Sequence, residues 1–388
     1  MYNIKLLNNI SDIIYTQLTP DTFQITEDLE NAHGVMVRSA NMRDMELPSK
    51  LLGIARCGAG VNNIPLDKCT KQGIVVFNTP GANANAVKEL VLASLFLTSR
   101  KIYEGIEWVK TLKDKGNDIP KLIEKGKSAF TGPEVTGKKL GVIGLGAIGA
   151  LVANDAHGIG MDVTGYDPFI SVKAAWSLSR AVHRADSLES LLAESDYISI
   201  HIPLTPETYD YIDKKAFSKM KKGARLLNFS RGELVNTEDL LAAVDDGIVS
   251  VYATDFPNEQ MLDNENVIPI PHLGASTPES EDNCALMASN QLQTYIETGN
   301  IINSVNFPHC EMPKLEHLRI TVAHQNVPNM VSQITSHLAD SNINIANMMN
   351  KSKGNTAYTI IDIDGEAPSE LLQSILDIDG VIKVRVLP

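Results

Sequence analysis

The sequence predicts an α/β protein built on parallel sheets, with a C-terminal module of a different strand order. Apolar segments of strand length alternate with helical patterns through most of the chain, as expected for consecutive βαβ units. After a proline-containing connector at residues 306–313, the order becomes strand, helix, two strands, helix and strand. Because this order differs from the repeated βαβ units before it, we expect a separate C-terminal module that begins near residue 316.

The individual elements follow from short apolar runs and from helical spacing of apolar residues. Strands are expected at residues 34–37, 51–55, 74–77, 140–143, 161–166, 197–200, 225–229 and 249–252. Helices are expected at residues 238–245, from Ala84 through 85–99 toward Trp108, and from Thr277 through Tyr295. The C-terminal module has strands at 318–324, 343–350, 358–363 and 381–387 and helices at 330–340 and 369–378, a ferredoxin-like βαββαβ order.

The composition is that of a globular protein and argues against several classes of function. A chain of 388 residues suits about two or three domains. With a formal net charge of −13 and no cluster of Lys and Arg, we expect no nucleic-acid partner. No apolar run reaches the ~18 residues of a membrane span, and residues 1–10 lack the pattern of a signal peptide. The four scattered cysteines have no metal-binding spacing, so we expect a cytoplasmic protein with reduced thiols and no metal.

A glycine-rich segment follows the strand at residues 140–143 and opens a helical pattern. Its sequence is GLGAIG, residues 144–149. Gly144 permits the tight turn, Gly146 lets the backbone approach a pyrophosphate, and Gly149 lets helix and strand pack closely. The pyrophosphate then lies at a helix N-terminus, where free N–H groups attract anions. The alternative is that these glycines serve turns only.

The next strand completes the context that this glycine pattern requires. It ends at Asp167, about 20 residues further on. A carboxylate there can accept a hydrogen bond from a ribose 2′-hydroxyl and would repel a 2′-phosphate. The sequence therefore predicts a Rossmann-type, doubly wound domain that binds NAD.

Two polar residues near strand ends are candidates for chemistry. Arg231 follows the strand at 225–229, at the sheet edge where doubly wound folds bind ligands, and its guanidinium suits capture of a carboxylate. His272 has acids nearby in the chain, so it is a candidate acid–base residue. Taken alone, Arg231 could equally be a capping or ion-pairing arginine, and His272 a hydrogen-bonded loop histidine.

Motifs spread over nearly the whole chain resemble one enzyme family. They are ARCGAGVNNI, NTPGANANAVKEL, GVIGLGAIG, YDP, HIPLTPET, NFSRGELVN and PHLGAST. The chain resembles the D-isomer-specific 2-hydroxyacid dehydrogenases, and within them the branch that oxidises D-3-phosphoglycerate. The resemblance implies that Arg231 holds the substrate carboxylate, His272 takes the hydroxyl proton and Glu259 stabilises the imidazolium. Glu259 lies in a segment one residue shorter than the family pattern, but no other carboxylate lies between Asp255 and Asp263.

The resemblance also implies the residues that bind cofactor and substrate. Those for NAD are Gly144, Gly146, Ala147, Ile148, Gly149, Asp167, His201, Pro203, Ser230, Asp255, His272 and Gly274, with Asp255 at the nicotinamide carboxamide. Those for the substrate are Arg38, Arg56, Gly58, Ala59, Gly60 and Arg231. Arg38 and Arg56 resemble phosphate contacts, and Arg38 is the more specific indicator of phosphate. As alternatives, both arginines could be surface charges at strand ends.

The family organisation places the Rossmann-type domain inside a flavodoxin-like α/β substrate domain. We therefore expect a substrate domain at 1–100, an NAD domain at 101–280, a return to the substrate domain with a linker at 281–315, and a ferredoxin-like ACT domain at 316–388. ACT domains bind amino acids, and the residues that correspond to the serine contacts are His324, Asn326 and Asn344. Asn329 replaces a glycine of the ACT turn, and it can adopt positive φ. The alternative is a dimerisation module without a ligand.

The resemblance thus predicts an enzyme of serine biosynthesis that uses NAD, responds to L-serine and forms a homodimer or homotetramer. Two other readings stay open at this point. One is a reductase of glyoxylate, hydroxypyruvate or another 2-keto acid, although such enzymes usually lack the C-terminal module. The other is a non-catalytic NAD sensor similar to the C-terminal-binding-protein corepressors, which the Arg231, Glu259 and His272 set disfavours.

Overall fold

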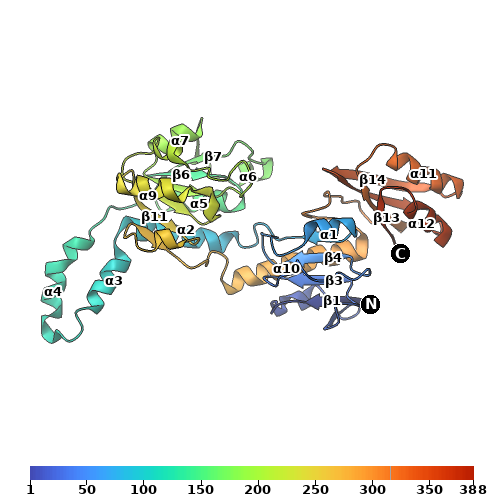
Figure 1. Ribbon diagram of the computed structural model, residues 1–388, viewed down its shortest axis with the longest axis horizontal. Coiled ribbons are helices and arrows are strands. Elements are labelled where there is room, and N and C mark those ends of the chain that lie inside the picture. Colours follow the sequence, from blue (N-terminus) through green and yellow to red (C-terminus); the bar gives the residue numbers. More distant parts are fainter. Residues whose placement is uncertain (315) are drawn as a thin grey trace. The chain divides into compact units, whose positions relative to one another are not determined.

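The computed structural model describes residues 1–314 and 316–388, and it confirms the predicted fold class. The chain divides into two compact units, a first unit of residues 1–82 and 281–388 and a second unit of residues 83–280. The first unit contains a five-stranded and a four-stranded sheet, and the second contains a seven-stranded sheet (Figure 1). No helix among the described residues is long and apolar enough to cross a membrane.

The N-terminal sheet of the first unit is entirely parallel, with the strand order β2-β1-β3-β4-β5 of flavodoxin-like folds. Its elements are β1 (Tyr2–Leu6), β2 (Phe23–Thr26), β3 (Gly34–Val37), β4 (Gly53–Arg56), α1 (Leu66–Lys71) and β5 (Val75–Phe77). Helix α10 (Pro278–Thr298) returns to this sheet and lies close on it, since a Cβ at Gly34 would come within 2.9 Å of Leu292. β1 and β2 were not predicted, because only Ile4 and Phe23 are buried in them.

The sheet of the second unit is also parallel, in the order β12-β11-β10-β9-β6-β7-β8. Its strands are β6 (Lys139–Ile143), β7 (Asp162–Tyr166), β8 (His183–Arg184), β9 (Tyr197–Ile200), β10 (Ala224–Asn228), β11 (Val249–Thr254) and β12 (Val267–Pro269). Its helices are α2 (Ala84–Ser99), α3 (Ile102–Lys110), α4 (Ile119–Gly126), α5 (Ala147–Gly158), α6 (Val172–Ser177), α7 (Leu188–Glu194), α8 (Lys214–Phe217) and α9 (Thr237–Asp245). The chain reverses its direction of winding between β6 and β9, which is the topological switch point where such folds bind ligands.

The boundary between the units differs from the expected one. The sequence predicts a division after residue 100, whereas the observed division precedes helix α2. Val87, Val91 and Leu95 of this helix are buried in the core that contains Val142 of β6. Helix α2 therefore belongs to the second unit. The other expected boundary, after residue 315, falls at a residue outside the described part of the chain.

The expected helix from Ala84 toward Trp108 is two helices. The first of these helices, α2, ends at Ser99 because the backbone of Arg100 is extended. The second, α3, begins at Ile102. The hydroxyls of Ser94, Thr98 and Ser99 donate to carbonyls three or four residues back, a competition with the helical ladder that bends and weakens helices. Beyond the break, α3 and α4 form an arm that extends from the rest of the second unit (Figure 1).

The C-terminal module, residues 316–388, has an antiparallel sheet in the order β14-β15-β13-β16. Its elements are β13 (Leu318–Gln325), α11 (Met330–Asp340), β14 (Ile345–Lys353), β15 (Thr356–Ile363), α12 (Ser369–Leu376) and β16 (Val381–Leu387), the βαββαβ order that the sequence predicts. Both helices share one core with the sheet. Tyr358 and Ile360 belong instead to the core of the N-terminal sheet, together with Phe77, Tyr295 and Phe307.

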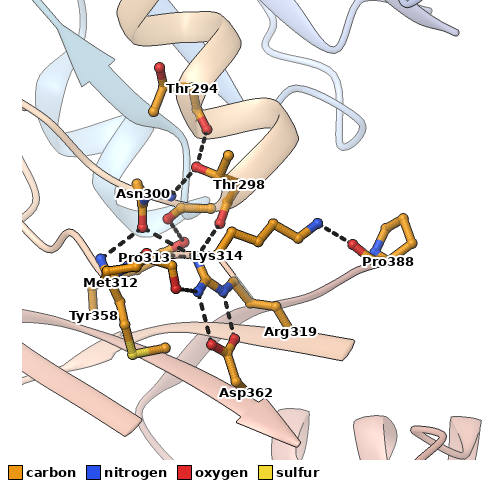
Figure 2. A network of polar contacts seen from close by, with 11 residues as sticks. Thr294, Thr298, Asn300, Met312, Pro313, Lys314, Arg319, Tyr358, Asp362 and Pro388 are labelled. Atoms are coloured by element: carbon orange, nitrogen blue, oxygen red, sulfur yellow. Dashed lines mark hydrogen bonds and ion pairs between the residues drawn. The ribbon is translucent and has the colours of Figure 1, made fainter. Parts of the chain in front are cut away.

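A fully buried arginine joins the C-terminal module to helix α10 and to the connector (Figure 2). Arg319 pairs with Asp362 of β15 through two hydrogen bonds of 2.7 and 2.9 Å. Its remaining donors reach the carbonyls of Thr298, Met312 and Pro313 at 2.8 to 3.1 Å. All three chain segments are therefore fixed around one guanidinium.

Other side chains of the module also bind carbonyls near the end of α10. The Arg385 guanidinium donates to Ile296 O at 2.9 Å and lies 4.7 Å from the centre of the Tyr295 ring. The Tyr358 hydroxyl donates to Gly299 O at 2.8 Å. The last carbonyls of a helix have no partners within the helix, so the module supplies the C-terminal cap of α10.

Asp362→Ala should lower the free energy of unfolding by about 3–5 kcal/mol, because it leaves the Arg319 charge buried without its partner. Urea unfolding at neutral pH measures the loss. The control is Asp379→Ala, which removes an exposed carboxylate of the same module. Equal stability of the two variants would show that the ion pair does not hold the module in place.

Candidate active site

The glycine-rich segment forms a tight turn between β6 and α5 at the switch point. Gly144 has φ of +89°, and a Cβ at Gly149 would lie 1.9 Å from the carbonyl oxygen of Gly144. No atom lies within 4 Å of where a Cβ of Gly146 would be. The open space above Gly146 and the free N–H groups at the start of the twelve-residue α5 fit the pyrophosphate of a dinucleotide.

Asp167 lies beside this turn, directly after β7. Its Oδ2 accepts a hydrogen bond of 2.9 Å from Leu145 N, and its Oδ1 accepts one of 2.8 Å from Phe169 N. These contacts fix the carboxylate, and each oxygen retains a second lone pair. The geometry suits acceptance of hydrogen bonds from ribose hydroxyls.

The loop after β10 is held in place by its own side chains. Asn228 is buried, and its Nδ2 donates to Arg231 O at 2.8 Å. The Ser230 hydroxyl donates to Ile200 O at 2.8 Å, which joins the loop to the end of β9. Arg231 therefore projects from a fixed backbone, and its Nη1 donates to Ser230 O at 2.6 Å.

Phe256 is a site residue that the sequence does not reveal. The Arg231 guanidinium carbon lies 6.0 Å from the centre of the Phe256 ring, and the His272 ring centre lies 4.6 Å from it. One aromatic side chain thus contacts both residues predicted to act on the substrate. Its position directly after Asp255, at the end of a buried strand, is the only signal in the sequence.

Asp255 is the buried carboxylate of this cluster, with an exposed fraction of 2%. Its Oδ2 accepts from Gly274 N at 3.2 Å, whereas its Oδ1 has no partner among the described residues. Burial raises the pKa of Asp255, and the charges of His272 and Arg231 oppose that rise. A buried acceptor without a donor is costly, so Oδ1 fits a ligand amide such as the nicotinamide carboxamide.

Glu259 does not join this cluster. It is exposed in the 3₁₀ turn η5 (Glu259–Met261). No ion pair between Glu259 and His272 is found in the part of the chain that the structure describes. Of the predicted catalytic residues, the structure brings together Arg231 and His272, with Asp255 as the carboxylate that interacts with both.

His201 follows β9 and faces the glycine turn. A Cβ at Gly149 would lie 3.3 Å from its Cβ. Its Nε2 lies 2.8 Å from Ser199 Oγ, and its Nδ1 is buried without a partner in the described residues. Burial lowers the pKa of His201 to about 3, so the ring is neutral at physiological pH. Pro203, in the same loop, accepts from Thr208 Oγ1 at 2.7 Å.

The predicted substrate residues of the first unit lie at the ends of β3 and β4. Arg56 Nε donates to Arg38 O at 3.1 Å, so the two arginines are neighbours. Arg38 Nη1 lies 2.6 Å from Glu281 Oε1 of α10. Gly58 has φ of +145°, and its N–H donates to Arg56 O at 2.9 Å. The N–H groups of Ala59 and Gly60 make no backbone hydrogen bond within the described residues, so they remain the candidates for binding a carboxylate.

The three predicted effector residues differ in their surroundings. His324 is buried, with Nδ1 at 2.8 Å from Gln325 O and Nε2 at 2.9 Å from Thr359 Oγ1. Asn326 and Asn344 are exposed, and Asn344 Nδ2 donates to Asp364 Oδ2 at 2.6 Å. Asn329 has φ of +68°, the left-handed conformation that a glycine would adopt, so the turn retains its shape.

The described residues contain no group of three or more His, Cys, Asp or Glu side chains that could hold a metal ion. All four cysteines are buried and unpaired.

The depressed pKa of His201 predicts a loss of stability in acid. Its pKa is about 6.5 in the unfolded chain and about 3 in the folded one, so the unfolded state binds the extra proton in between. Stability should therefore fall as the pH drops from 7 toward 3, with a loss of about 2 kcal/mol at pH 5 from this residue. Urea unfolding of His201→Gln at pH 7 and 5 should show a smaller loss than the wild type. The exposed His157→Gln is the control, and identical pH dependence in all three proteins would contradict the role of His201.

Comparisons with known proteins agree with this geometry. Residues 92–274 match the family described as D-isomer specific 2-hydroxyacid dehydrogenase, NAD binding domain. The D-3-phosphoglycerate dehydrogenase of Haemophilus influenzae is 31% identical over 97% of this chain and 92% of its own length. The enzyme of the same name from Escherichia coli K12 is 31% identical over 95% of this chain and 90% of its length.

A solved structure gives the same result. The NAD⁺-bound 3-phosphoglycerate dehydrogenase of Entamoeba histolytica is 26% identical, with a TM-score of 0.62 over 79% of this chain and 98% of that one. The glycine turn, the fixed Asp167 and the unpartnered Asp255 Oδ1 supply what such a cofactor requires. The chain therefore belongs to the D-isomer-specific 2-hydroxyacid dehydrogenase family and is an NAD-dependent dehydrogenase.

Proposed function

We propose that this enzyme oxidises D-3-phosphoglycerate to 3-phosphohydroxypyruvate, the first step of L-serine biosynthesis. The observation that carries the proposal is the pair of neighbouring arginines, Arg38 and Arg56, in a protein with a formal net charge of −13. A 2-hydroxy acid without a phosphate needs one cationic contact for its carboxylate, and Arg231 supplies that. The two further arginines suit a second anionic group. The names of the two bacterial relatives support the same substrate.

The mechanism assigns a task to each residue of the cluster. Arg231 binds the substrate carboxylate and orients C2, and His272 accepts the proton of the C2 hydroxyl. The glycine turn, Asp167 and Asp255 would hold NAD, which would supply the acceptor for the hydride that leaves C2. As the C2–H bond breaks, the hydroxyl proton passes to His272 and the C2–O bond becomes a carbonyl, so the substrate leaves as the 2-keto acid. Phe256 restricts the ring of His272 and the guanidinium of Arg231 by packing against both.

The direct test compares substrates. NADH formation is followed with D-3-phosphoglycerate, D-glycerate and D-lactate, each with NAD or NADP. The proposal expects the highest kcat/KM for D-3-phosphoglycerate with NAD, because only this substrate uses the paired arginines. Equal or higher kcat/KM for D-glycerate or D-lactate would instead favour a general 2-hydroxyacid dehydrogenase or reductase. No turnover of any of the three would favour an NAD sensor.

His272→Ala and Arg231→Ala should each lower kcat/KM at least ~10²-fold, equivalent to about 2.7 kcal/mol of transition-state stabilisation. Steady-state kinetics with D-3-phosphoglycerate measures the loss. His157→Ala, an exposed histidine at the end of α5, is the control and should retain activity. Turnover near the wild-type value in either site variant would remove the proposed mechanism.

Glu259 remains our proposed partner of the imidazolium, and the same assay separates it from Asp255. Glu259→Gln should lower kcat while leaving the affinity for NAD unchanged, since Glu259 has no proposed contact with the cofactor. A silent Glu259→Gln with a strongly impaired Asp255→Asn would transfer the role to Asp255, the carboxylate that is buried beside His272.

We also propose that the enzyme is a cytoplasmic homodimer or homotetramer that assembles through its second unit. The arm formed by α3 and α4 exposes apolar side chains, namely Ile102, Tyr103, Ile106 and Val109. Several apolar side chains exposed together on one helix are typical of a subunit interface. The four reduced cysteines suit the cytoplasm.

We propose further that the C-terminal module is an ACT domain that binds L-serine and inhibits the enzyme. Asn326 and Asn344 are exposed, with their amide nitrogens donating to Gly354 O and Asp364 Oδ2, and Asn329 retains the turn between Asn326 and α11. His324 contributes by supporting the turn, since both of its ring nitrogens have partners within the module.

Asn344→Ala should abolish serine inhibition, because it removes an amide proposed to bind the effector. Inhibition assays and calorimetry with millimolar L-serine measure the effect, and Asn347→Ala, on the strand that begins directly after Asn344, is the control. The absence of serine binding to the wild-type enzyme would make the module a structural one.

A further inference from the structure

An ion pair in the first unit connects the proposed phosphate-binding arginine to helix α10. Arg38 Nη1 lies 2.6 Å from Glu281 Oε1, and the two side chains are 37% and 45% exposed. Arg38 directly follows β3, and Glu281 is the fourth residue of α10. The pair therefore joins the end of a strand in the N-terminal sheet to the helix that packs on this sheet.

Both partners of this pair are held by further contacts. Asn8 Oδ1 accepts hydrogen bonds from the N–H groups of Arg38, Ser39 and Ala40 at 2.8 to 3.1 Å. Ser11 and Asp282 form a hydrogen bond between their side chains, which fixes the first turn of α10. The three N–H groups after β3 already have an acceptor, so a phosphate bound here depends on side chains for its contacts.

We propose that Glu281 is a specificity-determining residue that takes the place of the substrate phosphate on Arg38 in the free enzyme. This inference rests on the proposed function. A carboxylate and a phosphate bind a guanidinium through the same charge-assisted hydrogen bonds, so they compete for it. A phosphate monoester carries a charge of about −1.5 to −2 at pH 7, against −1 for the carboxylate. A phosphorylated substrate therefore displaces Glu281, whereas a substrate without phosphate leaves the pair intact.

Because both side chains of the pair are partly exposed, the replacement of Glu281 by a phosphate requires little free energy. An ion pair between half-exposed side chains is weak, equivalent to no more than about a fivefold change in an equilibrium constant. Once released, the Glu281 carboxylate remains in the first turn of a 21-residue helix, where the helix dipole stabilises negative charge. Glu281 thus lowers the affinity for phosphate slightly and neutralises Arg38 when no phosphate is present.

The test uses the full-length enzyme and the variant Glu281→Gln, which keeps the shape of the side chain and removes its charge. Glu279→Gln is the matched control, because Glu279 is exposed in the same turn and forms no ion pair within the described residues. KM is measured for D-3-phosphoglycerate and for D-lactate, and calorimetry measures the binding of inorganic phosphate. Glu281→Gln should lower the phosphoglycerate KM and the phosphate Kd by about two- to fivefold, with a smaller change for D-lactate.

A double variant shows whether the effect acts through Arg38. In the Arg38→Ala background, Glu281→Gln should no longer change phosphate binding, because its partner is absent. The proposal is overturned if Glu281→Gln weakens phosphate binding, matches Glu279→Gln, or has the same effect with and without Arg38. Failure of the proposed function is distinct, since it would appear as poor phosphoglycerate turnover by the wild type, while the phosphate calorimetry still tests the ion pair.

Discussion

The architecture of the first unit depends on how the charge of Arg319 is compensated. A guanidinium that is fully buried is costly unless its donors find acceptors, and here they find the Asp362 carboxylate and three carbonyls. Those carbonyls belong to the end of α10 and to the connector, not to the sheet that carries Arg319. The requirement to satisfy one side chain therefore fixes the position of the C-terminal module on the helix (Figure 2).

Helix α10 connects the contacts of Arg319 with the segment that carries His272. Its C-terminal carbonyls are capped by Arg319, Arg385 and Tyr358, and the segment directly before it carries His272. Removal of the whole C-terminal module would be the simplest way to seek an active, serine-insensitive enzyme. The structure argues against so simple an outcome, because truncation would uncap α10 and expose Phe77 and Phe307, whose core includes Tyr358. A point substitution in the module therefore separates regulation from folding better than a truncation does.

The nucleotide fingerprint and most of the strands were predictable because they follow local rules. Gly144, Gly146 and Gly149 each meet a backbone requirement that acts within a few residues, and the structure shows the positive φ, the open space and the close approach that the spacing predicts. Asn329 likewise adopts the left-handed conformation expected from its position. Phe256 and Arg319 were not predictable, since their roles depend on partners that are distant in the sequence or reached only through a loop. The break at Arg100 is not evident in the sequence because apolar residues resume directly after it, and the hydroxyls that donate to carbonyls of α2 leave no hydrophobic signal.

For the catalytic carboxylate, the sequence motif and the structural environment indicate different residues. The motif places Glu259 near His272, but spacing cannot show whether a side chain on a loop reaches its partner. The structure places Asp255 in the low-dielectric environment, where burial raises its pKa and the charges of His272 and Arg231 hold it down. If His272 takes the substrate proton, as we propose, its positive charge would stabilise the ionised form of Asp255 further, and the carboxylate would stabilise the imidazolium in return. In the proposed mechanism a single buried carboxylate would bind the cofactor amide through Oδ1 and interact electrostatically with the base, whereas Glu259 is exposed in the 3₁₀ turn η5.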